Sequence, residues 1–262
     1  MYNISSELLV INEKYGLVGF KQHEGYIFYG NLCLNHKYND IILNNELYIS
    51  MFVPFTFPNE LPIVKDIEKK IDNKFHKNAN DVLCLACDTE IILDLKSREN
   101  ATICDFIERY LLPYLYSYTY FKKYGKTPFG DRSHGSEGII EFYKDYFKLE
   151  DIDIAFLFLE YMSLKKYRGH NLCLCGSGKK LRNCHGIKAI DLMKKVRIGN
   201  ISNDYNKCVE EINYYKKLKN KKRMLEYKRM QQKKRLQYYL FPPKSPFEIS
   251  IPKFYETFIK KD

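Results

Sequence analysis

The chain has 262 residues, 45% of them hydrophobic and 29% charged, with a formal net charge of +11 at pH 7. This length predicts one large domain or two small ones. The hydrophobic content is high enough for a substantial core, which argues against a chain that is disordered throughout. No stretch of about 18 uncharged apolar residues is present, and the start, MYNISSELLV, lacks the pattern of a secretory signal. We therefore expect a cytoplasmic protein with no membrane partner, whose eight cysteines stay reduced. The clustered cysteines indicate metal binding or catalysis, whereas the isolated Cys33, Cys104 and Cys208 are expected to be structural.

The basic charge is unevenly distributed. Residues 187–262 hold 20 Lys and Arg against 8 Asp and Glu, whereas residues 1–186 hold 23 against 24. From Tyr214 to Tyr239, runs of Lys and Arg are interspersed with tyrosines. This mixture suits contact with a nucleic-acid backbone combined with base stacking, and it equally suits a solvated helix against an acidic protein partner.

The first part of the chain predicts a helix followed by strands. Residues 4–14 have the apolar spacing of a helix, with Ser5 or Ser6 as its cap. Aromatic and β-branched residues predict strands at 25–34 and 45–53, with turns at Asn39–Asp40 and Asn44–Asn45. Three prolines between Pro54 and Pro62 predict an extended crossing segment instead of a central strand.

The part that follows predicts mainly helices. Apolar residues recur every three or four positions over 102–122, and Pro113 is expected to kink or split this helix. Ser136 is expected to cap a helix at 137–147, and the apolar residues of 151–167 predict a buried helix. The whole order indicates an α+β fold, an antiparallel sheet flanked by helices, followed by further helices, a small zinc module and a basic helical tail.

The strongest motif is a cluster of sulfur and nitrogen ligands, Cys173-x-Cys175 followed by Cys184-His185. Three thiolates and an imidazole are ligands of tetrahedral Zn²⁺, and a fully protein-filled set indicates a structural zinc site. The intervening Gly176-Ser177-Gly178-Lys179-Lys180 does not fit the Walker phosphate loop, which needs an earlier glycine and a Ser or Thr after the lysine.

This segment resembles the SEC-C motif, a zinc module named for the C-terminus of the SecA translocation ATPase. The likeness rests on Cys173-x-Cys175-Gly176-Ser177-Gly178-Lys179-Lys180-x-Arg182-x-Cys184-His185. The resemblance implies a partner-binding appendage, because such modules are attached to many unrelated proteins.

A second cysteine stretch, residues 76–88, places Cys84 between Leu83 and Leu85 after a polar loop that holds His76 and Asn78. A thiol beside imidazole and amide donors suits nucleophilic acyl transfer, with Asn78 or Asn80 able to stabilise an oxyanion. On spacing alone, a buried structural cysteine is an equal alternative. Cys84-x-x-Cys87 also has the spacing of a redox pair, but it lacks thioredoxin-like flanking residues and a βαβ pattern.

The order of these features resembles the ubiquitin-conjugating enzyme fold. A sheet, a proline-containing segment (Phe57-Pro58 to Val64), a His-x-Asn motif (His76-Lys77-Asn78) and then Leu-Cys-Leu precede a helix. Lys77 stands where that family has proline, and the loop to the cysteine is shorter. The resemblance covers roughly residues 1–150 and implies that Cys84 carries an acyl group as a thioester.

The loop at 130–138 resembles a segment of bacterial ubiquitin-conjugating-like proteins of CBASS-type antiphage operons. There, a set of Cys, Glu and two His residues is thought to form the active site. This resemblance implies that Cys84, His76, His134 and Glu137 fill these roles, His134 as base and Glu137 as the residue that orients it. It also implies a cGAS-like nucleotidyltransferase as the protein that is transferred.

We therefore predict a thioester-forming conjugating enzyme. Its expected parts are a catalytic domain at 1–150, a connecting helix at 151–170, the zinc motif at 171–187 and a basic tail at 188–262. No G-x-G-x-x-G is present, so acyl activation by another protein and direct attack on the substrate both stay open. A non-catalytic adaptor, with an inactive conjugating-like fold and a zinc module that binds a protein or RNA, is the alternative.

Overall fold

A computed structural model describes residues 4, 6–38, 41–72, 75–77, 79–128, 135–164 and 167–214, together with positions 217, 221, 224 and 229. By internal contacts the chain divides into residues 1–211 and residues 212–262. The described positions of the second unit are helical, and most of the predicted basic tail lies outside the described residues. The described residues contain no helix with the length and apolar character needed to cross a bilayer.

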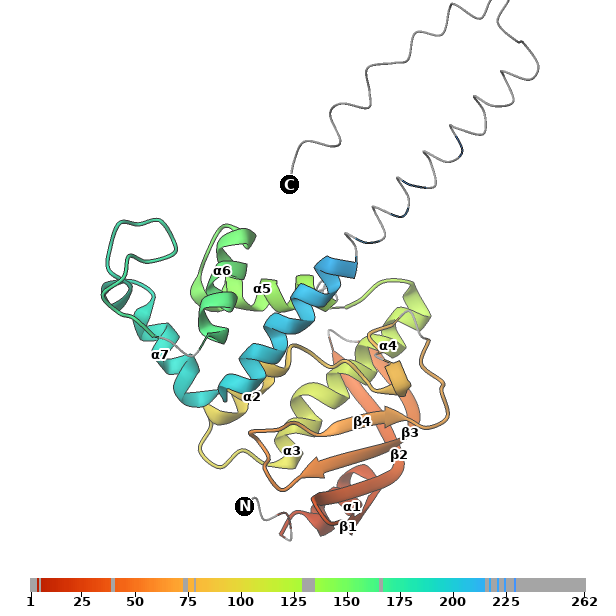
Figure 1. Cartoon of the computed structure of the whole chain (residues 1–262). Helices are drawn as coiled ribbons and strands as arrows, with labels where there is room; N and C mark the ends of the chain where they lie inside the picture. Colours follow the sequence, from red (N-terminus) through yellow and green to blue (C-terminus); the bar gives the residue numbers. More distant parts are fainter. Residues whose placement is uncertain are drawn as a thin grey trace, which may run out of the picture. The chain divides into compact units, whose positions relative to one another are not determined.

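The first unit begins with a helix and an antiparallel sheet (Figure 1). Helix α1 spans Leu8–Tyr15, and the four-stranded sheet has the order β1-β2-β3-β4. The strands span Leu17–Lys21, Gly25–Tyr38, Ile41–Pro54 and Ile63–Asp66. The predicted α+β class with an antiparallel sheet is therefore confirmed.

Several local predictions for this region were wrong. Strands β1 and β4 were not predicted, and Asn44–Asn45 lies inside β3 instead of forming a turn. The long pairing of β2 with β3 absorbs the two asparagines, because ladder hydrogen bonds satisfy their backbone groups. Glu7 is the N-cap residue of α1, in place of the predicted serine, and makes no side-chain cap hydrogen bond.

The two faces of the sheet differ in burial. Phe28, Met51 and Val64 are paired in register across β2, β3 and β4, and all three are buried. The neighbouring register row holds Phe20, Ile27, Phe52 and Ile63 on the opposite face, where Phe20 and Ile63 are exposed. This follows from the two-residue period of a strand, which places successive side chains on opposite faces.

Helical segments cover the buried face. The short 3-10 turn η1 (Ala79–Asp81) leads to α2 (Asp88–Lys96), and α3 (Ile103–Phe106) continues through a π-helical turn, η2 (Ile107–Leu111), into α4 (Leu112–Tyr124). Pro113 lies in the first turn of α4, directly after the π-helical turn. The predicted effect of this proline is seen as a change of helix type beside it, while the backbone of Leu111 and Leu112 stays helical. Helix α4 packs against β2 and β3.

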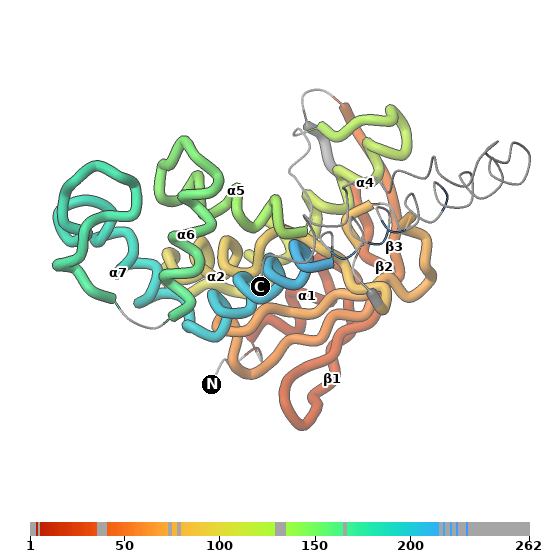
Figure 2. The backbone as a smooth tube through the Cα atoms, turned by 45° about the horizontal axis from the view of Figure 1, so that its top comes forward, coloured from red at the N-terminus to blue at the C-terminus, as the bar shows by residue number. Residues whose placement is uncertain are grey.

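The remaining helices come after α4 in the chain, and α5, α6 and α7 lie on the side of α2 away from the sheet (Figures 1 and 2). They are α5 (Gly135–Phe147), α6 (Ile152–Ser163), the 3-10 turn η3 (Leu181–Asn183), α7 (Gly186–Lys195) and a further helix over residues 198–214. Ser136 lies inside the first turn of α5, so its predicted capping position was wrong. Asp151 caps α6 by accepting hydrogen bonds from the backbone N–H groups of Asp153 and Ile154.

Helix α2 joins two apolar cores. Its Ile91 and Leu95 belong to the core formed by α1, the sheet, α3 and α4. Its Ile92 belongs to a second core formed by α5, α6, α7 and residues 201–208. Adjacent positions on a helix point in different directions, so one short helix can serve both cores. The approach to α2 from Cys84 is therefore placed where the two cores meet.

Candidate functional site

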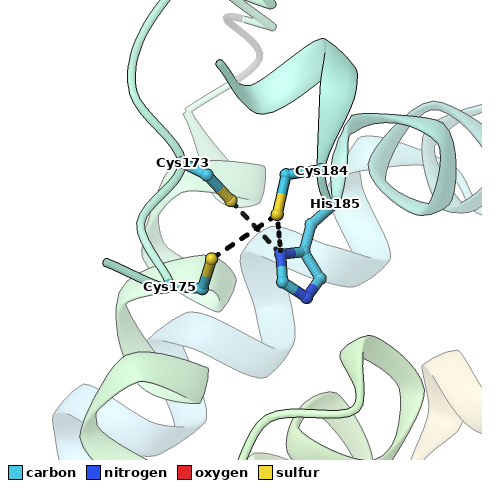
Figure 3. A group of neighbouring side chains, drawn as sticks. All are labelled: Cys173, Cys175, Cys184 and His185. Carbon is cyan, nitrogen blue, oxygen red and sulfur yellow. Dashed lines mark hydrogen bonds between the residues drawn. The ribbon is translucent and has the colours of Figure 1, made fainter. Parts of the chain in front are cut away.

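The four predicted zinc ligands lie together (Figure 3). The Cys173 Sγ is 3.2 Å and the Cys184 Sγ 3.3 Å from His185 Nδ1, and the Cys175 and Cys184 sulfurs are 3.6 Å apart. All four ligand atoms lie within 4.8 Å of one another. In a tetrahedral Zn²⁺ site with S and N ligands these separations are roughly 3.5 to 3.8 Å. The sulfur–sulfur distance lies in this range and the two sulfur–nitrogen distances are slightly shorter, so the ligand types and their closeness fit this metal.

Local backbone geometry brings these ligands together. Gly176 and Gly178 have φ values of 76° and 71°, the left-handed region that glycine adopts without strain. The turn they form returns the chain so that the Cys173 N–H donates to the Lys179 carbonyl at 2.8 Å. Cys184 ends η3, and His185 is the N-cap residue of α7.

The thiols of the cluster differ in acidity. Burial raises the pKa of Cys173 to about 11. Burial also opposes ionisation of Cys175, but hydrogen bonds from Ser177 outweigh it and lower the pKa of Cys175 to about 6. A metal ion would displace the protons of the other thiols, because the thiolate is the ligating form.

The second candidate site is Cys84, whose side chain is partly exposed. Its backbone N–H donates to the His76 carbonyl at 2.8 Å, and the N–H of Leu83 donates to the Val64 carbonyl at 2.9 Å. The Tyr114 hydroxyl, from α4, also donates to the His76 carbonyl at 3.1 Å. These bonds fix the backbone of the thiol-bearing loop against β4 and α4.

Lys77, which occupies the proline position of the resembled motif, has a structural role. Its side chain is 3% exposed, and its ammonium group lies 3.0 Å from the Asp81 carboxylate. The same group donates to the Ile71 carbonyl at 3.0 Å. Lys77 therefore connects the residues before and after it in this loop. Its partner Asp81 has a left-handed φ of 61°.

The electrostatic surroundings do not favour a resting thiolate at Cys84. Burial raises the pKa of the Cys84 thiol, and the nearby Asp88 carboxylate raises it further. The Lys207 ammonium, from the helix at 198–214, acts in the opposite direction. Because the thiolate is the nucleophile, Cys84 needs a base or a cation when it reacts.

The other predicted residues of this site are only partly placed. His76 directly precedes Lys77 and packs its ring edge-on against Phe75, with ring centroids 5.0 Å apart. Glu137 is exposed in the first turn of α5. Asn78 and His134 lie outside the described residues, so their roles stay predictions.

Cys87 belongs to a buried polar group that sequence reasoning did not find. It is the N-cap residue of α2, and its thiol donates to Asp204 Oδ2 at 3.6 Å. Asp204 also accepts from the Thr89 hydroxyl at 2.5 Å and from the Tyr143 hydroxyl at 3.2 Å. Burial raises the pKa of Asp204 to about 6. No local motif signals this group, because its members come from three separate helices.

Comparison with known proteins identifies one feature of the chain. The family model of the SEC-C motif matches residues 171–187. The match contains all four clustered ligands, so the zinc-type motif predicted for this segment is confirmed. No curated protein matches the chain, and no solved structure matches it either.

Proposed function

We propose that this protein is a ubiquitin-conjugating-like acyl transferase that carries a protein C-terminus as a thioester on Cys84. The observation that carries the proposal is the placement of a partly exposed thiol directly after a four-stranded antiparallel sheet and a 3-10 turn, at the approach to a helix. This is the element order of the fold that residues 1–150 resemble. The fixed loop backbone supports it, since a carrier thiol needs a defined position against two successive partners.

The chemistry follows from the thiol. The Cys84 thiolate attacks the carbonyl carbon of an activated or scissile acyl group, a C–S bond forms, and the leaving group departs. An amine then attacks the thioester carbonyl, the C–S bond breaks, and the thiol recovers its proton. His76 and Asn78 shape the loop or stabilise the oxyanion, while His134 and Glu137 supply and orient the base.

The protein transferred is, in this proposal, a cGAS-like nucleotidyltransferase in bacterial antiphage defence. This identity comes from the resemblance of residues 130–138 alone. The acyl group is activated either by a separate protein or by direct attack of Cys84 on the substrate. The Zn²⁺ bound by Cys173, Cys175, Cys184 and His185 is structural, and the basic tail offers a surface for an acidic protein or nucleic acid.

The test is a gel assay with the purified protein and its candidate nucleotidyltransferase. We expect an adduct that thiol reductants cleave in the wild type and that Cys84→Ala abolishes. Cys84→Ser should instead give an oxygen ester that reductants leave intact and mild alkali cleaves. Conjugation and phage protection that persist in Cys84→Ala would refute the enzymatic proposal.

The SEC-C match favours one alternative, a non-catalytic adaptor. An adaptor needs the zinc module and the tail but not the thiol. Phage protection that survives Cys84→Ala but disappears in Cys175→Ala would identify this second function.

A further inference from the structure

The helix at 198–214, which follows α7, directs two charged residues at the first turn of α2, shortly after Cys84. Asp204 and Lys207 are three positions apart, so they lie on the same face of the helix at 198–214. Asp204 accepts the hydrogen bond from Thr89 at 2.5 Å, and Lys207 pairs with Asp88 at 3.0 Å. Both contacts reach the first turn of α2, shortly after Cys84.

The buried Asp204–Thr89 contact sets the position of the Lys207–Asp88 pair. Asp204 is 1% exposed and Thr89 fully buried, so their bond fixes the register of the helix against α2. The Lys207–Asp88 pair is about half exposed on both sides, which leaves it free to respond to what approaches Cys84. An exposed ion pair adds little stability to the fold. The place of the Lys207–Asp88 pair near Cys84 is therefore better explained by an effect on the thiol than by stabilisation of the fold.

We propose that Lys207 is a positioning residue that neutralises Asp88 and thereby sets the reactivity of the Cys84 thiol. The inference deepens the proposed function, because it names what controls the same thiol. Asp88 lies four residues after Cys84, and its negative charge disfavours ionisation of a sulfur that must become negative itself. The ammonium of Lys207, 3.0 Å from the Asp88 carboxylate, offsets that charge.

The groups that face the thiol-bearing loop come from several elements, and Lys207 is a cation among the described residues that acts on the thiol. From the loop, His76 offers its backbone carbonyl to the Cys84 N–H. From α4, Tyr114 faces the same carbonyl with a hydroxyl whose pKa is raised mainly by burial. From α2 comes Asp88, and from the helix at 198–214 comes Lys207, both of which act on Cys84.

The test measures alkylation of Cys84 by iodoacetamide across pH 6 to 10, with the full chain and mass spectrometry to assign the modified cysteine. We expect Lys207→Gln to lower the rate at pH 7.5 about three- to tenfold and to move the midpoint of the profile to higher pH. Lys207→Arg should retain the wild-type profile. Asp88→Asn should act in the opposite direction, and Asp88→Asn/Lys207→Gln should return the midpoint close to that of the wild type.

A matched control is Lys195→Gln, which removes a similar ion pair with Asp191 at 3.1 Å on α7. Its profile should equal that of the wild type. The proposal is overturned if Lys207→Gln leaves the midpoint unchanged, or if Lys207→Gln and Asp88→Asn shift the midpoint in the same direction. The assay needs no acyl substrate, so it can succeed even if the thioester proposal fails, and the reverse also holds.

Discussion

The hydroxyl of Thr89 donates a hydrogen bond to the carboxylate of Asp204, which lies 115 residues further along the chain. Both side chains are buried, and among the residues that the structure describes the second carboxylate oxygen of Asp204 has no hydrogen-bond partner. The contact joins α2 to the helix at 198–214. It is one of the contacts by which the part of the chain beyond the zinc ligands meets the segment that follows Cys84.

The Asp204 carboxyl makes a specific contribution to the pH dependence of stability. Burial raises its pKa from 3.8 to about 6, so between these values the folded state binds more protons than the unfolded state. Stability from this group is therefore present below pH 4 and is lost as the pH rises through 6. Relative to Asp204→Asn, the wild type should lose about 3 kcal/mol of unfolding free energy between pH 4 and pH 7.

Urea unfolding of both proteins at several pH values measures this difference. Comparison with the variant removes the contribution of the other carboxyl groups. Asp191→Asn, at a more exposed position of α7, is the control and should show no such growing difference. A difference between Asp204→Asn and the wild type that stays constant from pH 4 to pH 7 would contradict the prediction.

Metal removal should affect the second core more than the first. Cys173 and Leu181 are both members of the second core, so loss of Zn²⁺ would loosen the packing of these two residues. We expect about one Zn²⁺ per chain, and we expect Cys184→Ser or a strong chelator to lower the melting temperature markedly. Atomic absorption and thermal unfolding check this. Cys33→Ser, which alters an exposed cysteine on β2, should retain the metal and the melting temperature.

Tyr114 and Tyr118 offer a matched pair for the Cys84 loop. Tyr114 donates to the His76 carbonyl at 3.1 Å, and Tyr118, one turn later on α4, donates to the Lys70 carbonyl at 2.7 Å. Replacing either by Phe should cost about 1 kcal/mol of stability. Tyr114→Phe alone should change the rate at which Cys84 reacts with iodoacetamide, because only this hydroxyl holds the carbonyl that fixes Cys84. Equal rates in the two variants would show that Tyr114 does not control the loop.

Adjacent residues on α6 provide a test of the second core. Phe158 is fully buried and stacks on Phe147 with centroids 4.6 Å apart, whereas Leu157 is 45% exposed. Phe158→Ala should cost about 3 to 5 kcal/mol through the cavity it leaves. Leu157→Ala should cost less than about 1 kcal/mol. Denaturant unfolding compares them, and similar losses would mean that α6 does not pack as described.

The zinc cluster could be predicted from the sequence because its ligands are close along the chain. Cys173, Cys175, Cys184 and His185 lie in one short segment, and the glycines between them adopt the left-handed turns that the motif needs. The change of helix type beside Pro113 depends on an equally local signal. In both cases, the residue type alone restricts the backbone.

The surroundings of Cys84 could be predicted only in part. The loop from His76 to Cys84 was indicated by its residues, but Tyr114 looked like one more apolar position of a helical stripe. Asp204 and Lys207 gave no signal, because their importance depends on long-range packing against α2. Strand β4 was missed because it is short and follows three prolines.

The position of Ile91 and Ile92 in separate cores has a consequence for dividing the protein. A fragment that stops near residue 128 would keep the sheet and Cys84 but would leave Ile92 and Thr89 facing water. Such a fragment should aggregate or lose the defined start of α2. The shortest piece that retains a native Cys84 environment therefore has to extend at least to Cys208, the last member of the second core.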